Sequence, residues 1–235
     1  MHDVVDAAQP AAAVPGDLAG LALGELARSH PQALGLLRQL RLDYCCGGAR
    51  TLREAAADRG LELQQLEQQI AALAPQACDA PSDPAELTQY IRERFHDTHR
   101  AELPELALLA RKVERVHHDH PQVPAGLGEL LERVLRELSE HMAKEEQILF
   151  PMMQRMPRGT PLNAPISRMR DEHVEHAQLL QQLRDITRDG ELPEQACNSW
   201  RALYAGVAKF ADDLVQHIHL ENNLLFPAFE PARGA

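Results

Sequence analysis

One pattern of histidine, glutamate, phenylalanine and proline occurs twice in the sequence. The copies are HMAKEEQILFP, residues 141–151, and HIHLENNLLFP, residues 217–227. Residues four apart in a helix lie on the same face, so each copy predicts an imidazole beside a carboxylate. The pairs are His141 with Glu145 and His217 with Glu221. This ligand mixture suits iron or manganese, and two copies that face each other in a helix bundle could hold two metals with bridging carboxylates.

The residues around these pairs favour burial over a solvated helix face. Apolar residues at helical spacing flank the first pair in the stripe Val134, Leu138, His141, Glu145, Ile148 and Leu149. The second stripe is Phe210, Leu214, His217, Glu221, Leu224 and Leu225. An ionisable group in an apolar stripe is costly unless it is paired or bound to a metal. The two stripes therefore indicate a buried metal site.

Two further helical segments each carry a pair of histidines that could complete this site. The pairs are His96 with His99 and His173 with His176. The chain resembles two similar helical hairpins, because His96 precedes His141 by 45 residues and His173 precedes His217 by 44. The members of a pair are three residues apart, so both could face the core. The spacing does not choose between the two members of a pair, since the distances from His99 to His141 and from His176 to His217 also agree within one residue.

Two carboxylates lie close to the candidate ligands in the sequence. Glu137 precedes His141 by one helical turn, and Glu172 is adjacent to His173. Such carboxylates often orient ligand imidazoles, although solvated surface charge explains both of them equally well. The histidines of the segment HHDHP, residues 117–121, lie in a predicted loop, and we expect them to be solvated.

Adjacent cysteines, Cys45 and Cys46, precede two glycines and form a second candidate site. A disulfide between neighbouring residues would need a strained ring, so we expect two thiols. The glycines allow a sharp backbone turn that leaves the sulfurs accessible. Soft thiolates can receive iron, bind another metal or exchange redox equivalents, whereas the alternative role is buried packing. Cys78 and Cys197 lack such a context.

The composition favours an all-α protein. Only 4% of the 235 residues are aromatic, and no long β-branched run occurs. The net charge of −11 argues against nucleic acid or an anionic membrane surface as a partner. No apolar run is long enough to span a membrane, and the N-terminal residues lack the features of a secretion signal. We therefore expect a cytoplasmic protein whose cysteines are mostly thiols.

The order of helices and loops divides the chain into four segments. These are an Ala/Pro-rich disordered tail (1–16), a small helical domain with the Cys-Cys-Gly-Gly turn (17–74), a linker (75–84) and a bundle (85–230). The bundle is predicted from four long helical stretches, which run from about 85 to 118 with a kink at Pro104, from 124 to 151, from 163 to 189 and from 193 to 227. Long helices joined by short loops favour an antiparallel four-helix bundle.

Together these motifs resemble a known family. LGELA, DYCCGG, HDTHRAELPEL, HMAKEEQILFP, DEH and HIHLENNLLFP are similar to motifs of the iron-sulfur cluster repair di-iron proteins, also called regulators of cell morphogenesis and nitric-oxide signalling. The similarity covers nearly the whole chain from Leu23. It implies a haemerythrin-like antiparallel four-helix bundle with two non-haem iron ions, preceded by a small helical domain. The implied ligands are His96, His141, Glu145, His173, His217 and Glu221, of which the two glutamates bridge the irons.

The resemblance also implies a function. It predicts repair or protection of iron-sulfur clusters damaged by oxidative or nitrosative stress, with iron-sulfur proteins as clients and Cys45 and Cys46 as a delivery or acceptor point. Four histidines and two glutamates leave open positions for nitric oxide or dioxygen, so a nitric-oxide-binding or nitric-oxide-reducing protein without a repair role is the alternative. Dioxygen carriage fits less well, because it does not need the cysteine domain. The oligomeric state stays open, a dimer included.

Overall fold

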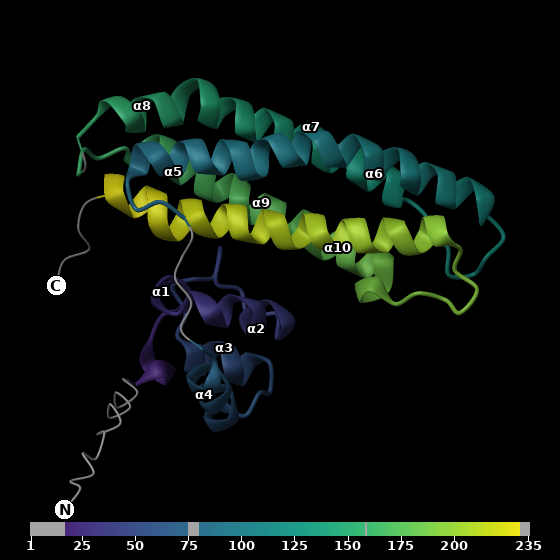
Figure 1. Cartoon of the computed structure of the whole chain (residues 1–235), viewed down its shortest axis with the longest axis horizontal. Helices are drawn as coiled ribbons and strands as arrows, with labels where there is room; N and C mark the ends of the chain where they lie inside the picture. The colour runs from purple at the N-terminus through teal and green to yellow at the C-terminus, as the bar shows by residue number, and fades with distance from the viewer. Residues whose placement is uncertain (1–16, 75–79, 158, 231–235) are drawn as a thin grey trace, which may run out of the picture.

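The computed structural model describes residues 17–74, 80–157 and 159–230, which form a long helical bundle with a smaller helical unit against one side (Figure 1). Within these residues the chain is helical, and the sole β-type pairing is an isolated bridge between Ala22 and Thr51. The predicted all-α class is confirmed. The predicted tail and residues 75–79 of the predicted linker, with Cys78, lie outside the described residues.

The smaller unit contains four short helices. They are α1 (Leu23–Ser29), α2 (Leu34–Gln39), α3 (Leu52–Asp58) and α4 (Leu63–Ala72). A capping box begins α3: Thr51 Oγ1 accepts a hydrogen bond from Glu54 N, and the Glu54 carboxylate accepts one from Thr51 N at 2.8 Å. The Cys45–Cys46 turn lies between α2 and α3, as the sequence predicts.

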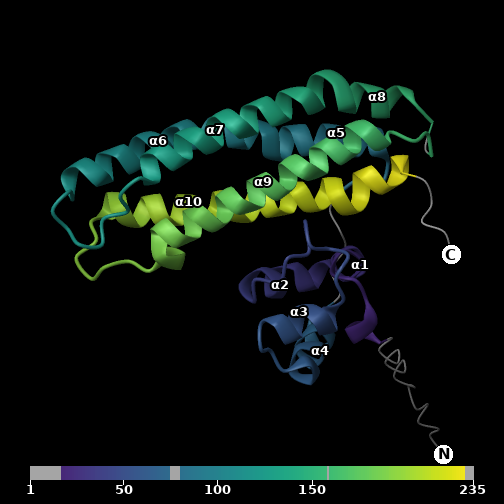
Figure 2. The ribbon, with the colours of Figure 1, turned by 180° about the vertical axis from the view of Figure 1, so that it is seen from behind.

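The bundle is made of four long helical runs that alternate in direction (Figures 1 and 2). The runs are α5 (Pro84–Ile91) with α6 (Asp97–Val116), α7 (Leu127–Lys144) with α8 (Phe150–Arg155), α9 (Asn163–Thr187) and α10 (Asn198–His219). Pro104 lies inside α6, and the helix continues through it. The last helix starts at Asn198 and not near Pro193, because residues 193–196 form a turn closed by a bond from Ala196 N to Pro193 O.

Each copy of the repeated motif contains a π-helical turn at its glutamate. The turns are Glu145–Leu149 and Leu220–Leu225, and a third, Arg92–His96, joins α5 to α6. In each motif the phenylalanine N–H donates to the glutamate carbonyl five residues earlier, and the proline that follows has no N–H to give. Such turns often occur at functional sites. The wider turn also rotates the helix, which is why Ile148 is 57% exposed although the predicted stripe included it.

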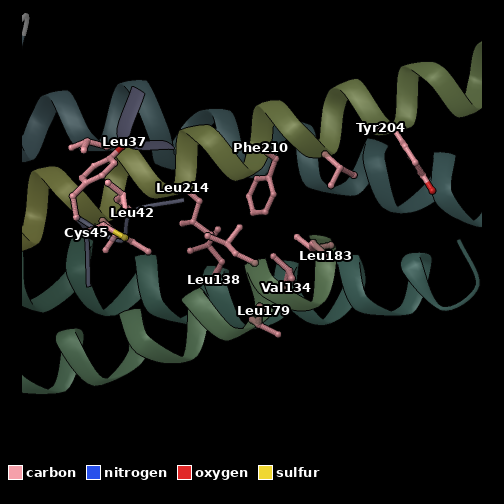
Figure 3. Close-up of a cluster of buried hydrophobic side chains, with 14 of the residues drawn as sticks. Leu37, Leu42, Cys45, Val134, Leu138, Leu179, Leu183, Tyr204, Phe210 and Leu214 are labelled. Carbon is pink, nitrogen blue, oxygen red and sulfur yellow. The ribbon is translucent and has the colours of Figure 1, made fainter. Parts of the chain in front are cut away.

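One apolar core joins the bundle to the smaller unit (Figure 3). Val134, Leu138 and Phe210 of the bundle belong to the same buried cluster as Leu37 and Cys45. Ion pairs link the two units as well, between Arg41 and Asp189 at 2.6 Å and between Arg38 and Asp212 at 3.5 Å. The cysteine turn is therefore packed against the bundle. No helix among the described residues is both long enough and apolar enough to cross a membrane.

Candidate metal centre

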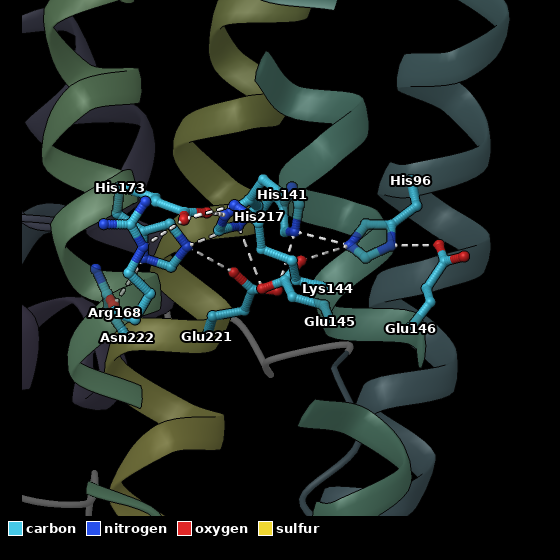
Figure 4. Close-up of polar contacts among 11 residues, drawn as sticks. His96, His141, Lys144, Glu145, Glu146, Arg168, His173, His217, Glu221 and Asn222 are labelled. Atoms are coloured by element: carbon cyan, nitrogen blue, oxygen red, sulfur yellow. Dashed lines mark hydrogen bonds and ion pairs between the residues drawn. The ribbon is translucent and has the colours of Figure 1, made fainter. Parts of the chain in front are cut away.

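Six ionisable side chains from all four runs of the bundle converge in its interior (Figure 4). They are His96, His141, Glu145, His173, His217 and Glu221, and each is at most 1% exposed. Three of them, His96, Glu145 and Glu221, lie within the π-helical turns, where the backbone departs from regular helix. The structure thus brings together the residues that the resemblance indicated.

The six side chains form two overlapping groups that share both glutamates. The first group is His96, Glu145, His217 and Glu221, the second is His141, Glu145, His173 and Glu221, and the ligand atoms of each lie within 4.8 Å of one another. The oxygens of Glu145 lie 3.4 Å from His96 Nε2 and 3.2 Å from His141 Nε2. Those of Glu221 lie 3.0 Å from His217 Nε2 and 3.0 Å from His173 Nε2. Each carboxylate therefore faces one histidine of each group, as a bridging ligand would.

The donor set fits two metal cations. Both oxygens of Glu145 and Oε2 of Glu221 are buried without a hydrogen-bond partner among the described residues, which is costly for a carboxylate that no cation neutralises. Burial alone would raise the pKa of Glu221, but the close imidazole of His173 and the other neighbouring histidines lower it, so the side chain stays ionised. Two positive ions between the histidine pairs would satisfy these oxygens.

Glu172 fixes the orientation of His141. Nδ1–H of His141 donates to Glu172 Oε2 at 2.9 Å, which turns Nε2 toward the glutamates. Lys144 and Arg168 donate to the other Glu172 oxygen at 2.7 Å and 2.8 Å. The bond from His141 is the main reason that the pKa of Glu172 falls to about 2, although burial opposes it. Burial would lower the pKa of His141, but Glu145 and Glu172 raise it to about 10.

Two orienting partners that the sequence reasoning missed lie directly after the motif glutamates. Nδ1–H of His96 donates to Glu146 Oε1 at 2.7 Å, and Nδ1–H of His173 donates to Asn222 Oδ1 at 3.0 Å. Glu146 and Asn222 occupy equivalent positions in the two copies of the repeat. This equivalence is the sequence signal that could have identified both residues as partners of the ligand histidines. By contrast, His217 Nδ1 has no hydrogen-bond partner in the described part of the chain, and its ring stacks on Phe95.

The cysteine turn contacts this centre directly. Asn222 Nδ2–H donates to the carbonyl of Cys45 at 2.9 Å, while its Oδ1 accepts from His173. The Cys46 thiol lies 3.5 Å from the main-chain carbonyl of His173 and donates to it. The hydrogen bond with the Cys46 thiol, together with burial, raises the pKa of Cys45 well above its ordinary value, so this thiol is protonated in the absence of a metal.

The remaining candidate histidines lie beside the ligand groups and not in them. His99 and His176 are buried, with ring centroids 5.5 Å from His217 and 4.8 Å from His141 respectively. Burial and the adjacent histidines lower the pKa of His99 to about 2 and that of His176 to about 3, so both rings are neutral. Glu137 is not brought to the centre, because it pairs with Arg133 on the surface at 2.7 Å.

The expectation that the loop histidines are solvated is wrong for two of the three. His117 and His120 are half-buried against Trp200, with ring centroids 5.1 Å and 5.3 Å away, whereas His118 is exposed. His117 Nε2 also lies 3.1 Å from the Cys197 sulfur. The loop folds back on the start of α10, and the tryptophan ring shields the two imidazoles from part of the solvent.

Comparison with known proteins agrees with this geometry. Residues 87–229 match the Hemerythrin HHE cation binding domain. The chain belongs to this family. Residues 21–74 match a domain of unknown function, DUF542. The resemblance inferred from the motifs is confirmed, and the family and the buried histidine–glutamate groups together show a metal-binding helical bundle.

Individual relatives are similar over most of their length. The iron-sulfur cluster repair protein YtfE of Pectobacterium atrosepticum is 50% identical over 210 residues, which cover 87% of this chain and 94% of the relative. The protein of the same name from Yersinia pseudotuberculosis serotype IB is 48% identical over 215 residues, covering 90% and 97%. The similarity therefore includes both the cysteine unit and the bundle.

Proposed function

We propose that this protein is a di-iron protein that repairs or protects iron-sulfur clusters damaged by oxidative or nitrosative stress, with iron-sulfur proteins as clients. The names of the relatives support this proposal. The observation that carries it is the contact between the cysteine turn and the ligand His173, through Asn222 and through the Cys46 thiol. A repair protein needs a site that holds iron and a group that exchanges it, and here the two adjoin.

In this proposal His96 and His217 would hold one iron and His141 and His173 the other, and Glu145 and Glu221 would be shared between them. Imidazole and carboxylate ligands suit iron, which when bound supplies redox and Lewis-acid chemistry. The chain holds the imidazoles in place through Glu146, Glu172 and Asn222. The apolar residues around the ligands keep bulk water away. Four protein ligands for each iron leave positions for a small ligand such as nitric oxide or dioxygen.

In this proposal the two units have different functions. They comprise residues 17–74 and 85–230 and are joined by a linker at 75–84. The bundle holds the irons, and Cys45 and Cys46 serve as the delivery or acceptor point for a client. Free thiols in such a role fit a reducing compartment, so we propose a cytoplasmic location.

The experiment that tests the delivery role replaces Cys45 and Cys46 with serine. The bond from Asn222 uses the main-chain carbonyl of Cys45, so the substitution leaves this contact to the metal centre in place. We expect the variant to keep its two irons and to lose restoration of a damaged cluster enzyme in a purified assay. Cys197→Ser is the matched control, since Cys197 is the residue before α10, and this helix starts at the end of the bundle away from the smaller unit (Figure 1). Restoration at the wild-type rate by the double variant would show that the thiols deliver nothing.

A second function, binding or reduction of nitric oxide without repair, is favoured by His99 and His176. These neutral, buried imidazoles lie beside the ligand groups, where each could donate a hydrogen bond to a small ligand. The test is anaerobic incubation of the di-ferrous protein with nitric oxide. Continued nitrous oxide production would indicate a reductase, whereas uptake that stops at a fixed ratio to iron would indicate binding.

A further inference from the structure

Three potential metal ligands meet in the cysteine turn, apart from the centre in the bundle. The Cys45 sulfur lies 3.7 Å from the Cys46 sulfur and 3.3 Å from Asp43 Oδ1, and the three donor atoms lie within 4.8 Å of one another. A tetrahedral metal with M–S bonds of about 2.3 Å places two sulfurs about 3.8 Å apart. An M–O bond of about 2.0 Å places the oxygen about 3.5 Å from each sulfur. The two separations measured from the Cys45 sulfur match this geometry.

The backbone of the turn holds these donors in place. Asp43 Oδ1 accepts a hydrogen bond from Cys46 N at 2.9 Å, which closes the turn. Gly47 makes the closure possible, because a Cβ atom there would lie 3.0 Å from the Asp43 carbonyl oxygen. Asn222 and Asn223 of the bundle bind the carbonyls of Cys45 and Tyr44 at 2.9 Å and 3.0 Å. The turn is thus supported from both units, as a preorganised site requires.

A cavity of about 210 Å³ at the boundary between the two units reaches two of the three donor residues. Asp43 and Cys45 line it, so Cys45 can be approached although only 7% of its surface is exposed. Four arginines from both units also line it: Arg38, Arg41, Arg59 and Arg184. Arg38 and Arg41 are already paired with Asp212, which also lines the cavity, and with Asp189. Two thiolates, a carboxylate and a divalent cation carry a net charge of −1, which Arg59 and Arg184 can offset.

We propose that Asp43, Cys45 and Cys46 form a third metal site that binds one thiophilic divalent cation. The identity of that cation as Fe(II) rests on the repair function proposed above, whereas the proposal of the site itself rests on the arrangement of the donor atoms in the turn. On binding, each thiol releases its proton to water as its sulfur bonds to the metal, and no electrons are transferred. Three protein donors leave the fourth tetrahedral position for a ligand from a client.

Anaerobic titration of the full-length, iron-loaded protein with Co(II) tests this proposal. We expect one additional cobalt per chain, a sulfur-to-cobalt charge-transfer absorption and an unchanged iron content. Cys46→Ser should abolish most of this absorption. Asp43→Asn keeps the acceptor for Cys46 N–H but loses the charged ligand, so cobalt should bind more weakly by about tenfold or more. Cys197→Ser should bind cobalt like the wild type.

The proposal is overturned if no third metal binds, if the absorption persists in the double variant of Cys45 and Cys46, or if Cys197→Ser abolishes it. Measuring repair on the same proteins separates this proposal from the delivery role. If a third metal binds but repair is intact after loss of the thiols, the site is supported and the delivery role is refuted. Repair that needs the thiols in a protein that takes up no third metal would refute the site alone.

Discussion

Removal of the Asn222 side chain tests whether the cysteine turn and the metal centre act as one structure. Asn222 is 6% exposed, and its side chain accepts a hydrogen bond from His173 Nδ1 and donates one to the Cys45 carbonyl. Alanine at this position leaves a buried N–H and a buried C=O without partners. It also lets the His173 ring rotate, because no other residue that the structure describes forms a hydrogen bond with its Nδ1.

The expected effects follow from these two bonds. Each buried group left without a partner costs about 1–3 kcal/mol, so Asn222→Ala should destabilise the protein by about 2–6 kcal/mol. Loss of a partner that orients a ligand imidazole weakens metal binding by about 10–100-fold. That loss corresponds to about 1.4–2.7 kcal/mol of binding free energy. The assays are thermal unfolding and competition for iron with a chelator.

Asn223 provides the matched control. Its side chain also donates to the smaller unit, at the Tyr44 carbonyl, but its other contact is His219, which is not in either ligand group. Asn223→Ala should therefore lower stability and leave iron affinity unchanged. Asn222→Asp keeps an oxygen acceptor for His173, so it should recover most of the affinity. Equal iron affinity in Asn222→Ala and Asn223→Ala would refute the proposed role of Asn222.

Three further outcomes are expected. His96→Ala should lose iron and His99→Ala should retain it, as metal analysis of the purified variants will show; equal losses would contradict the assignment. The pKa of Glu172 is lowered from 4.5 to about 2, so its stabilising contribution is complete above the ordinary value and is lost as the pH falls toward 2. The difference in Tm between metal-free wild type and Glu172→Gln should shrink over that range, and a constant difference would exclude the effect. Gly24→Ala should lower the free energy of unfolding by about 1–3 kcal/mol, since the added Cβ would collide with the side chain of Asn223. Gly35→Ala, which has open space around the added Cβ, should not destabilise the protein.

The sequence was sufficient for the fold class and for the pattern of the centre, because both depend on helical periodicity. The spacing His-x-x-x-Glu places imidazole and carboxylate on one face whichever bundle contains them. It could not separate His96 from His99, since both members of that pair are buried in the structure. The resemblance to a family made the choice, and the structure places His96 in a ligand group and His99 beside it.

Other features depend on how the helices pack and were beyond the reach of periodicity. Ile148 is exposed because the π-helical turn changes the rotation of the residues that follow Glu145. Glu146 reaches His96 only because α7 and α6 pack side by side. The half-burial of His117 depends on Trp200, which lies more than eighty residues later in the chain. For Glu146 and His117 the deciding partner is distant in sequence and lies across a contact between helices, whereas for Ile148 it is a local departure from the regular helix.

The two hairpins are similar in sequence, but they do not support the two halves of the centre equally. His141 and His173, which form one pair, are each held at Nδ1, by Glu172 and by Asn222. In the other pair only His96 has such a partner; His217 Nδ1 has none among the described residues and relies on stacking against Phe95. An imidazole without a hydrogen-bonded partner is less basic and rotates more easily. We therefore expect the half that contacts the cysteine turn to be the more rigid one, and changes of ligand or metal to be easier at the half that contains His217.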